Sequence, residues 1–172
     1  GISSDHECNS AAEACEKLAA GMDVFIRQGS AGKQLLDILP AVTKENISRF
    51  SLCTDDCHAA DILKFGHIDS IVAQAVAAGM SAADAVRMAT LNPAEHYNLN
   101  CGAIEVGRQA DIIFVPDLVK FKPNIVFKRG QMVAAKGEPL FTISPTDASK
   151  VKNTLHMPPV TKDKLALKGA AR

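Results

Sequence analysis

The stretch Met-Asp-Val-Phe-Ile-Arg occupies residues 22–27 and contains three adjacent large apolar residues. Such an unbroken run is typical of a strand that is buried on both faces, as in a parallel sheet. Before it, Ser10 and Glu13 have capping-box spacing and predict the start of a helix. After it, Ser30 can cap a second helix, and residues 49–54 have the pattern of another short strand. This alternation of helices and strands predicts a parallel α/β sheet or barrel.

The chain divides into three parts by its sequence patterns. Residues 1–100 continue the alternation and end in amphipathic segments, so we expect the α/β part of the fold there. Ser81 with Asp84 predicts one helix start in this part, and Asn92-Pro93 predicts another with Pro93 as the first helical residue. Residues 101–136 contain strand-like runs around the turn Arg129-Gly130, which predicts a small β unit. From Lys136 onward, seven Lys or Arg face three Asp or Glu, and large apolar residues are sparse. We therefore interpret residues 137–172 as a linker or a strip of a further domain.

The composition is that of a globular protein, with 47% hydrophobic and 22% charged residues in a chain of 172. Nineteen basic side chains balance nineteen acidic ones. This balance argues against nucleic acid as the main partner and against electrostatic attraction to a membrane surface. No apolar run in the sequence approaches the ~20 residues that span a bilayer. We expect neither nucleic acid nor a membrane as a partner.

The five cysteines show no disulfide-framework spacing. We expect reduced thiols, several of them buried, in a cytoplasmic protein. The segment from Cys53 to His58 has one residue too many for a haem-attachment motif, and no second cysteine pair completes a zinc cluster. The chain begins with Gly1 rather than Met, directly before residues with an active-site pattern. We therefore expect it to be a fragment or a processed product.

Two stretches place charged, metal-competent side chains directly after strand-like segments. They are Ser4-Asp5-His6-Glu7 and Thr54-Asp55-Asp56-Cys57-His58. In α/β barrels the active site lies at the carboxyl ends of the strands. An imidazole and a carboxylate from separate strands can share a divalent ion, and a further carboxylate can accept a proton from water. The alternative interpretation is that these carboxylates only cap helices and that the histidines are polar surface residues.

Two further residues have open assignments. Arg27 ends the buried strand, where it could bind an anion, orient a carboxylate or form a structural salt bridge. His67 opens a helix, where it could serve the site or simply cap the helix or pack in the core.

Several motifs together resemble the bacterial adenine deaminases of the amidohydrolase superfamily. In chain order they are Ser4-Asp5-His6-Glu7-Cys8, Arg27-Gln28-Gly29-Ser30, Thr54-Asp55-Asp56, Gly66-His67-Ile68-Asp69, and Met88-Ala89-Thr90-Leu91-Asn92-Pro93-Ala94. The segment from Gly102 to Gly130 is similar to the return of amidohydrolases to their small β-domain. The resemblance runs from Gly1 to about Pro159.

The resemblance implies a (β/α)₈ barrel that binds one or two divalent ions and hydrolyses adenine to hypoxanthine and ammonia. His6 matches a metal ligand at the end of the sixth barrel strand. Asp55 matches the aspartate after the eighth strand, which binds metal and shuttles a proton, so it is expected to be both a metal ligand and catalytic. Glu7 matches a catalytic acid that contacts the purine ring. The metal is expected to be manganese or iron in preference to zinc.

Four more positions match family motifs near the substrate pocket. These expected substrate-binding residues, which act alongside Glu7, are Arg27, Ser30, Asp56 and His67. The expected partner is adenine, and the expected assembly is a homo-oligomer in the cytoplasm.

The family's remaining metal ligands match no residue of this chain. A full barrel needs about 250 residues, so we expect a partial barrel of the last three strand–helix units, followed by the small β unit. Such a chain is expected to be inactive alone, and its open sheet edges favour self-association. Two alternatives remain open: a sister amidohydrolase acting on a cyclic amide or N-acyl group, and a non-catalytic subunit that completes a barrel with a separate partner.

Overall fold

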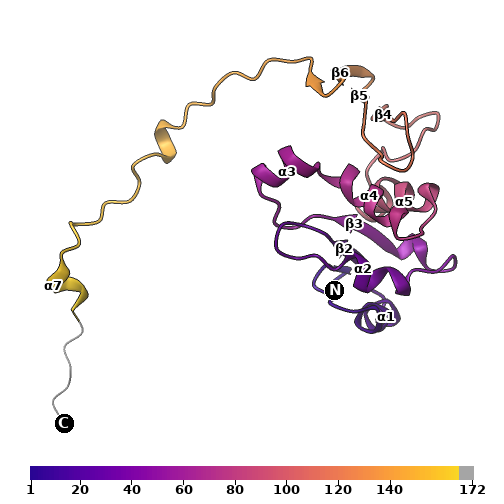
Figure 1. The fold of residues 1–172 in the computed structure, drawn as a ribbon, viewed down its shortest axis with the longest axis horizontal. Helices are drawn as coiled ribbons and strands as arrows, with labels where there is room; N and C mark the ends of the chain where they lie inside the picture. Colours follow the sequence, from indigo (N-terminus) through magenta and orange to yellow (C-terminus); the bar gives the residue numbers. More distant parts are fainter. Residues whose placement is uncertain (167–172) are drawn as a thin grey trace, which may run out of the picture. The chain divides into compact units, whose positions relative to one another are not determined.

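The computed structural model describes residues 1–166. It divides the chain into a compact unit, Gly1–Phe141, and a second unit that begins at Thr142 (Figure 1).

The centre of the first unit is a parallel sheet with the strand order β1-β2-β3 within the described residues. Its strands are β1 (Ser4–Asp5), β2 (Asp23–Arg27) and β3 (Phe50–Cys53). The three central residues of β2 are buried, as the apolar run predicted. Because all the strands run in the same direction, their carboxyl ends meet at one edge of the sheet. The parallel α/β prediction is therefore confirmed, while closure into a barrel stays a prediction.

Helices connect and cover these strands. They are α1 (Ala11–Ala19), α2 (Leu35–Ile38), α3 (Ala59–Phe65), α4 (Ile68–Ala77), α5 (Ala82–Ala89) and α6 (Leu91–His96), with short 3₁₀ turns η1 (Leu39–Ala41) and η2 (Ile47–Arg49). Helices α1 and α2 contact β2, whereas α4, α5 and α6 contact β3. The largest fully buried side chains come from both strands and helices: Ile26, Leu35, Ile38, Phe50, Ile71 and Met88.

The helix starts agree with the sequence in two places and differ in two. Ser10 and Ser81 cap α1 and α5, and each accepts a hydrogen bond from a backbone N–H three residues later. The prediction that Ser30 caps a helix is wrong, because α2 begins only after Gln34. Pro93 is the third residue of α6 rather than the first.

An antiparallel sheet follows the helices. It has the order β4-β5-β6-β7, with β4 (Ile112–Phe114), β5 (Ile125–Lys128), β6 (Gln131–Ala135) and β7 (Glu138–Pro139). Arg129 and Gly130 both have positive φ, 52° and 76°. This pair of values is typical of the tight turn that joins β-hairpin strands. β7 lies just beyond the boundary at residue 136 that the sequence suggested.

The second unit has little regular structure between residues 142 and 166. It contains a 3₁₀ turn, η3 (Ser149–Val151), and a short helix, α7 (Lys162–Leu165). No residue from 142 to 166 is buried. The interpretation of residues 137–172 as a linker or strip remains a prediction, and residues 167–172 lie outside the described part.

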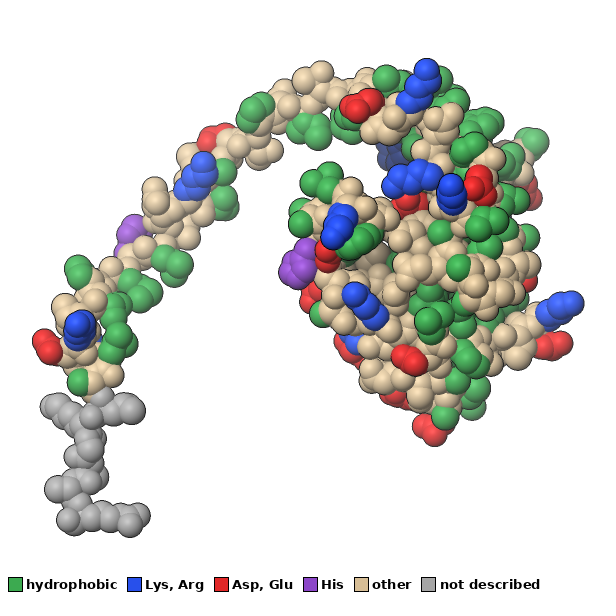
Figure 2. Space-filling view, viewed as in Figure 1, with side chains coloured by type: hydrophobic (Ala, Val, Ile, Leu, Met, Phe, Trp, Pro, Cys, Tyr) green, Lys and Arg blue, Asp and Glu red, His purple; other side chains and the backbone are tan. Residues whose placement is uncertain are grey.

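The surface of the first unit carries apolar side chains among charges of both signs (Figure 2). Leu63, Ile104 and Val106 are more than four-fifths exposed. Within residues 1–166 no helix has the length and apolar character needed to cross a membrane. All five cysteines lie in the described part as free thiols, and Cys8 alone is buried, so the expectation of several buried thiols is wrong.

Candidate active site

The polar residues singled out in the sequence lie at the carboxyl edge of the parallel sheet. His6 and Glu7 directly follow β1, and Arg27 is the last residue of β2. Asp55 and Asp56 follow β3. Parallel pairing of the strands thus brings together side chains that are far apart in sequence, at the edge where α/β proteins bind ligands.

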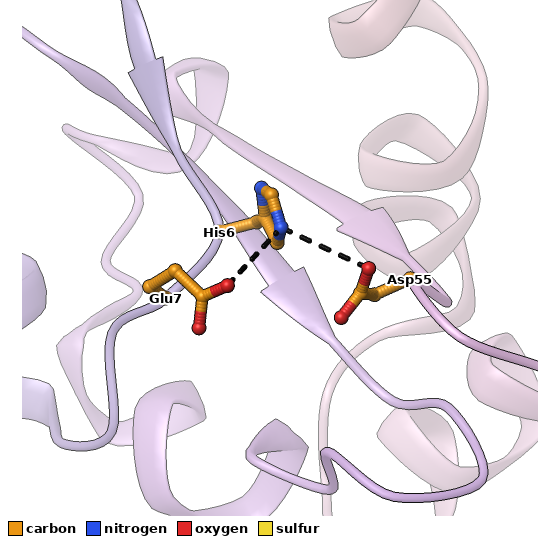
Figure 3. Close-up of side chains that lie close together, drawn as sticks. All are labelled: His6, Glu7 and Asp55. Atoms are coloured by element: carbon orange, nitrogen blue, oxygen red, sulfur yellow. Dashed lines mark ion pairs between the residues drawn. The ribbon is translucent and has the colours of Figure 1, made fainter.

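Three of these side chains converge. His6 Nε2 lies 3.5 Å from Glu7 Oε1 and 3.9 Å from Asp55 Oδ1. Figure 3 shows the imidazole of His6 between the two carboxylates. One donor atom from each residue lies within 4.8 Å of the other two. A divalent ion bonded at about 2.1 Å to a nitrogen and an oxygen holds those atoms roughly 3–4 Å apart. The donor set therefore fits a divalent metal.

Arg27 links the two carboxylates of this group. Its Nη1 donates to Glu7 Oε2 at 2.8 Å and to Asp55 Oδ2 at 3.0 Å. Its Nε donates to Gln34 Oε1 at 3.2 Å, and the side chain is only 13% exposed. Burial opposes the charged form, but the hydrogen bonds and charges of Asp55 and Glu7 outweigh it and raise the pKa of the guanidinium. Of the roles left open for Arg27, the structure shows contact with the carboxylates.

Both the hydroxyl and the backbone N–H of Ser30 form hydrogen bonds within the protein. Its hydroxyl donates to Asp61 Oδ2 and accepts from the backbone N–H of His58 at 2.9 Å. Its own backbone N–H donates to the carbonyl of Asp56 at 2.9 Å. The residue therefore ties the loop after β2 to the loop after β3.

Asp56 and His67 lie close to the metal-competent group without joining it. Asp56 has an exposed side chain next to Asp55. His67 occupies the N-cap position of α4 without a side-chain capping hydrogen bond, and its Nε2 lies 3.3 Å from the hydroxyl of Thr54, the residue before Asp55. Both stay predictions as substrate contacts.

Two thiols close in sequence to the site residues, those of Cys8 and Cys53, stay protonated near neutral pH. Burial, reinforced by the hydrogen bond that Cys8 donates to Asp5, raises the pKa of Cys8 to about 12. Burial together with the charge of Asp55 raises the pKa of Cys53 to about 11. Neither is a ready thiolate ligand.

Sequence reasoning missed Gln34 and Asp61, which support Arg27 and Ser30. Their partners are 7 and 31 residues away in sequence, and no local motif marks such pairs. His96 received no role from the sequence; its side chain is 10% exposed and packs against Phe25.

The chain is similar to known proteins along most of its length. Residues 4–133 match the model described as "Amidohydrolase family". Adenine deaminase 2 of Carboxydothermus hydrogenoformans is 45% identical over 168 residues, 97% of this chain and 30% of that protein. An adenine deaminase of Lysinibacillus sphaericus is 40% identical over 97% of this chain and 29% of its own length. The chain thus spans about 30% of the length of these relatives.

Solved structures share the fold at low sequence identity. A β-aspartyl dipeptidase from Fervidobacterium islandicum aligns with a TM-score of 0.62 at 16% identity, over 77% of this chain and 38% of that chain. An adenosine deaminase from Xanthomonas campestris with bound zinc aligns with a TM-score of 0.51 at 19% identity, over 88% of this chain and 40% of that chain. From the family match over residues 4–133, together with the fold, we conclude that this chain belongs to the amidohydrolase family.

Proposed function

We propose that this chain is part of a metal-dependent enzyme that hydrolyses adenine to hypoxanthine and ammonia. The convergence of His6, Glu7 and Asp55 at the carboxyl edge of the sheet is the observation that carries the proposal. The identity of 40–45% to proteins named adenine deaminase supports the choice of substrate.

Membership of the amidohydrolase family implies a divalent metal, and His6 and Asp55 are the residues that would hold it. A bound divalent ion makes water a better nucleophile near neutral pH. Asp55 accepts the proton that the attacking water loses as its oxygen bonds to the carbon that bears the amino group. Glu7 donates a proton to the ring nitrogen beside that carbon. Asp55 passes the proton from water to the amino group, the carbon–nitrogen bond breaks to release ammonia, and the proton of the added hydroxyl returns to Glu7 as the carbonyl of hypoxanthine forms. We propose manganese or iron in preference to zinc.

The site in this chain is open to solvent. The side chains of His6, Glu7 and Asp55 are 49%, 62% and 34% exposed. We propose that the three parallel strands are the last units of a barrel and that further strands cover this edge. The isolated chain is then inactive, and the whole enzyme is a cytoplasmic homo-oligomer with Asp56 and His67 lining the adenine pocket.

The test compares the isolated chain with the full-length protein, each loaded separately with Mn²⁺, Fe²⁺ or Zn²⁺. Bound metal and conversion of adenine to hypoxanthine are measured for both. We expect conversion by the full-length protein only, with most activity in the manganese or iron form. The variant His6→Asn should abolish conversion and lower metal content. The matched control His156→Asn, in the second unit, should change neither.

Other outcomes reassign the function. Hydrolysis of a cyclic amide or an N-acyl compound, with adenine untouched, would identify a sister amidohydrolase. No hydrolysis of either class by the metal-loaded protein would favour a non-catalytic subunit that completes a barrel.

A further inference from the structure

The carboxylates of Glu7 and Asp55 each direct one oxygen to Arg27 and the other to His6. Glu7 Oε2 and Asp55 Oδ2 both accept hydrogen bonds from Arg27 Nη1. The other oxygen of each group, Glu7 Oε1 and Asp55 Oδ1, faces His6 Nε2. One guanidinium nitrogen therefore fixes which oxygen of each carboxylate is directed toward the imidazole.

The guanidinium is itself held in place. Gln34 Oε1 accepts from its Nε, so the group is bonded on the side away from the carboxylates. A Cβ at Gly32 would overlap Arg27 Nε, so the absence of a side chain there makes room for the guanidinium. This support explains how a long, flexible side chain keeps one orientation.

The segment 27–32, which contains Arg27 and Gly32, also forms hydrogen bonds to the backbone on both sides of Asp55. Asp55 has φ 53°, in the left-handed region that few residues other than glycine occupy. The N–H of Gln28 donates to the carbonyl of Cys53, and the N–H of Ser30 donates to that of Asp56, both at 2.9 Å. A Cβ at Gly29 would overlap the carbonyl oxygens of Thr54 and Asp56. The segment 27–32 therefore holds Asp55 by its backbone as well as by its side chain.

We propose that Arg27 is a positioning residue, which directs one oxygen of Asp55 to the metal and one oxygen of Glu7 to the same side of the site, and that Ser30 and Gly29 hold the loop that makes this possible. This role replaces the substrate contact that the sequence suggested for Arg27 and Ser30. It rests on the proposed metal site, whose ligand Asp55 is oriented by Arg27 without contact between Arg27 and the ion.

The experiment measures metal affinity by titration without substrate, and kcat and KM for adenine, in the full-length protein. Arg27→Met should lower metal affinity and kcat about 10–100-fold, the usual cost of losing a residue that orients a ligand. KM should stay close to that of the unaltered protein, because no substrate contact is lost. Arg27→Lys should recover part of the loss. The control Lys33→Met removes an exposed charge from the same loop and should change neither quantity.

Gly32→Ala gives a second test that leaves every charge in place. Its Cβ displaces the guanidinium, so metal affinity and kcat should fall as in Arg27→Met. This variant keeps the proposal testable if Arg27→Met does not fold.

Two results would overturn the proposal. A higher KM with unchanged metal affinity would make Arg27 a substrate contact, and no change in any quantity would make it a structural ion pair. If the unaltered protein does not deaminate adenine, the proposed function fails, whereas the metal titrations still decide the role of Arg27.

Discussion

His96 Nδ1 lies 2.7 Å from Asp23 Oδ2, and this contact joins the last residue of α6 to the first residue of β2, 73 positions earlier. Arg49 also donates to Asp23, through its Nε. Burial of the Asp23 carboxyl opposes ionisation, but the hydrogen bonds from Arg49 and His96 outweigh it and lower its pKa. The cluster lies at the amino end of β2, opposite the metal-competent edge. Its expected role is stability, because the active sites of α/β barrels lie at the opposite, carboxyl end of the strands.

The first prediction concerns this cluster. Asp23→Asn should lower the free energy of unfolding by about 1–3 kcal/mol, because two hydrogen bonds lose their charged acceptor. Urea denaturation of the chain, followed by circular dichroism, measures the change. Glu16→Gln, on the exposed face of α1, should leave the midpoint unchanged. Equal midpoints for the two variants would show that the cluster contributes nothing.

The second prediction concerns Asn92, whose side chain is buried. Its amide nitrogen donates to the carbonyls of Ile47 and Phe50, and its oxygen accepts from Arg87 Nε. Asn92→Asp replaces the donor with an acceptor that faces two carbonyl oxygens. We expect a loss of about 2–4 kcal/mol in the free energy of unfolding, from unsatisfied groups in a buried place.

The same urea denaturation measures the effect of Asn92→Asp, and Asn98→Asp, in an exposed turn, is its control. A midpoint for Asn92→Asp within error of the control would refute this account of the Asn-Pro motif.

The third prediction concerns acid stability. Hydrogen bonds from Lys128, the backbone of Arg129 and Gln109 lower the pKa of Asp111 to about 2. The unfolded value is about 3.9. Because the pKa of Asp111 is lower in the folded state, the ionised carboxylate stabilises the folded chain. This stabilisation is complete above the unfolded pKa and is lost as the pH falls toward 2. It amounts to about 1–2 kcal/mol after allowance for solvent screening.

Asp111→Asn should therefore be less stable than the unaltered chain at pH 6 and equally stable near pH 2. Urea midpoints at both pH values measure this difference. If the urea midpoints of the variant and the unaltered chain differed by the same amount at both pH values, the charge of the Asp111 carboxylate would not be the cause of the difference in stability.

The fourth prediction concerns association. Within residues 1–166, β1 and β3 are the two open edges of the parallel sheet, and Ile2, two residues before β1, is 81% exposed. Open edges and exposed apolar surface both favour pairing between copies. Sedimentation velocity over a range of concentrations should show oligomers of the isolated chain. A monomer at every concentration would argue against uncovered barrel edges.

The sequence predicted the features that depend on neighbouring residues. The apolar run in β2 is buried, and Ser10 and Ser81 cap their helices. Helix α3 escaped prediction because it has only seven residues and its N-cap residue, His58, makes no side-chain capping hydrogen bond that would mark the start. Ser30 was misassigned because its hydroxyl has better partners in Asp61 and His58 than the following helix could offer.

The candidate site, too, could be predicted from the sequence only in part. Position after strand-like segments indicated the stretches 4–7 and 54–58, since parallel strands bring their carboxyl ends together, and the family resemblance then singled out His6, Glu7 and Asp55. The sharing of Arg27 between two carboxylates could not be predicted, because it depends on the register of β2 between its neighbours.

The hydrogen bonds of Arg27 also imply an order of assembly. Arg27 follows Glu7 by 20 residues and precedes Asp55 by 28. During synthesis the amino-terminal part of a chain emerges first. The pairing of β1 with β2 can thus bring Arg27 to Glu7 before β3 has joined the sheet. Asp55 arrives only when β3 adds, so the group of His6, Glu7 and Asp55 is complete only after all three strands have been made.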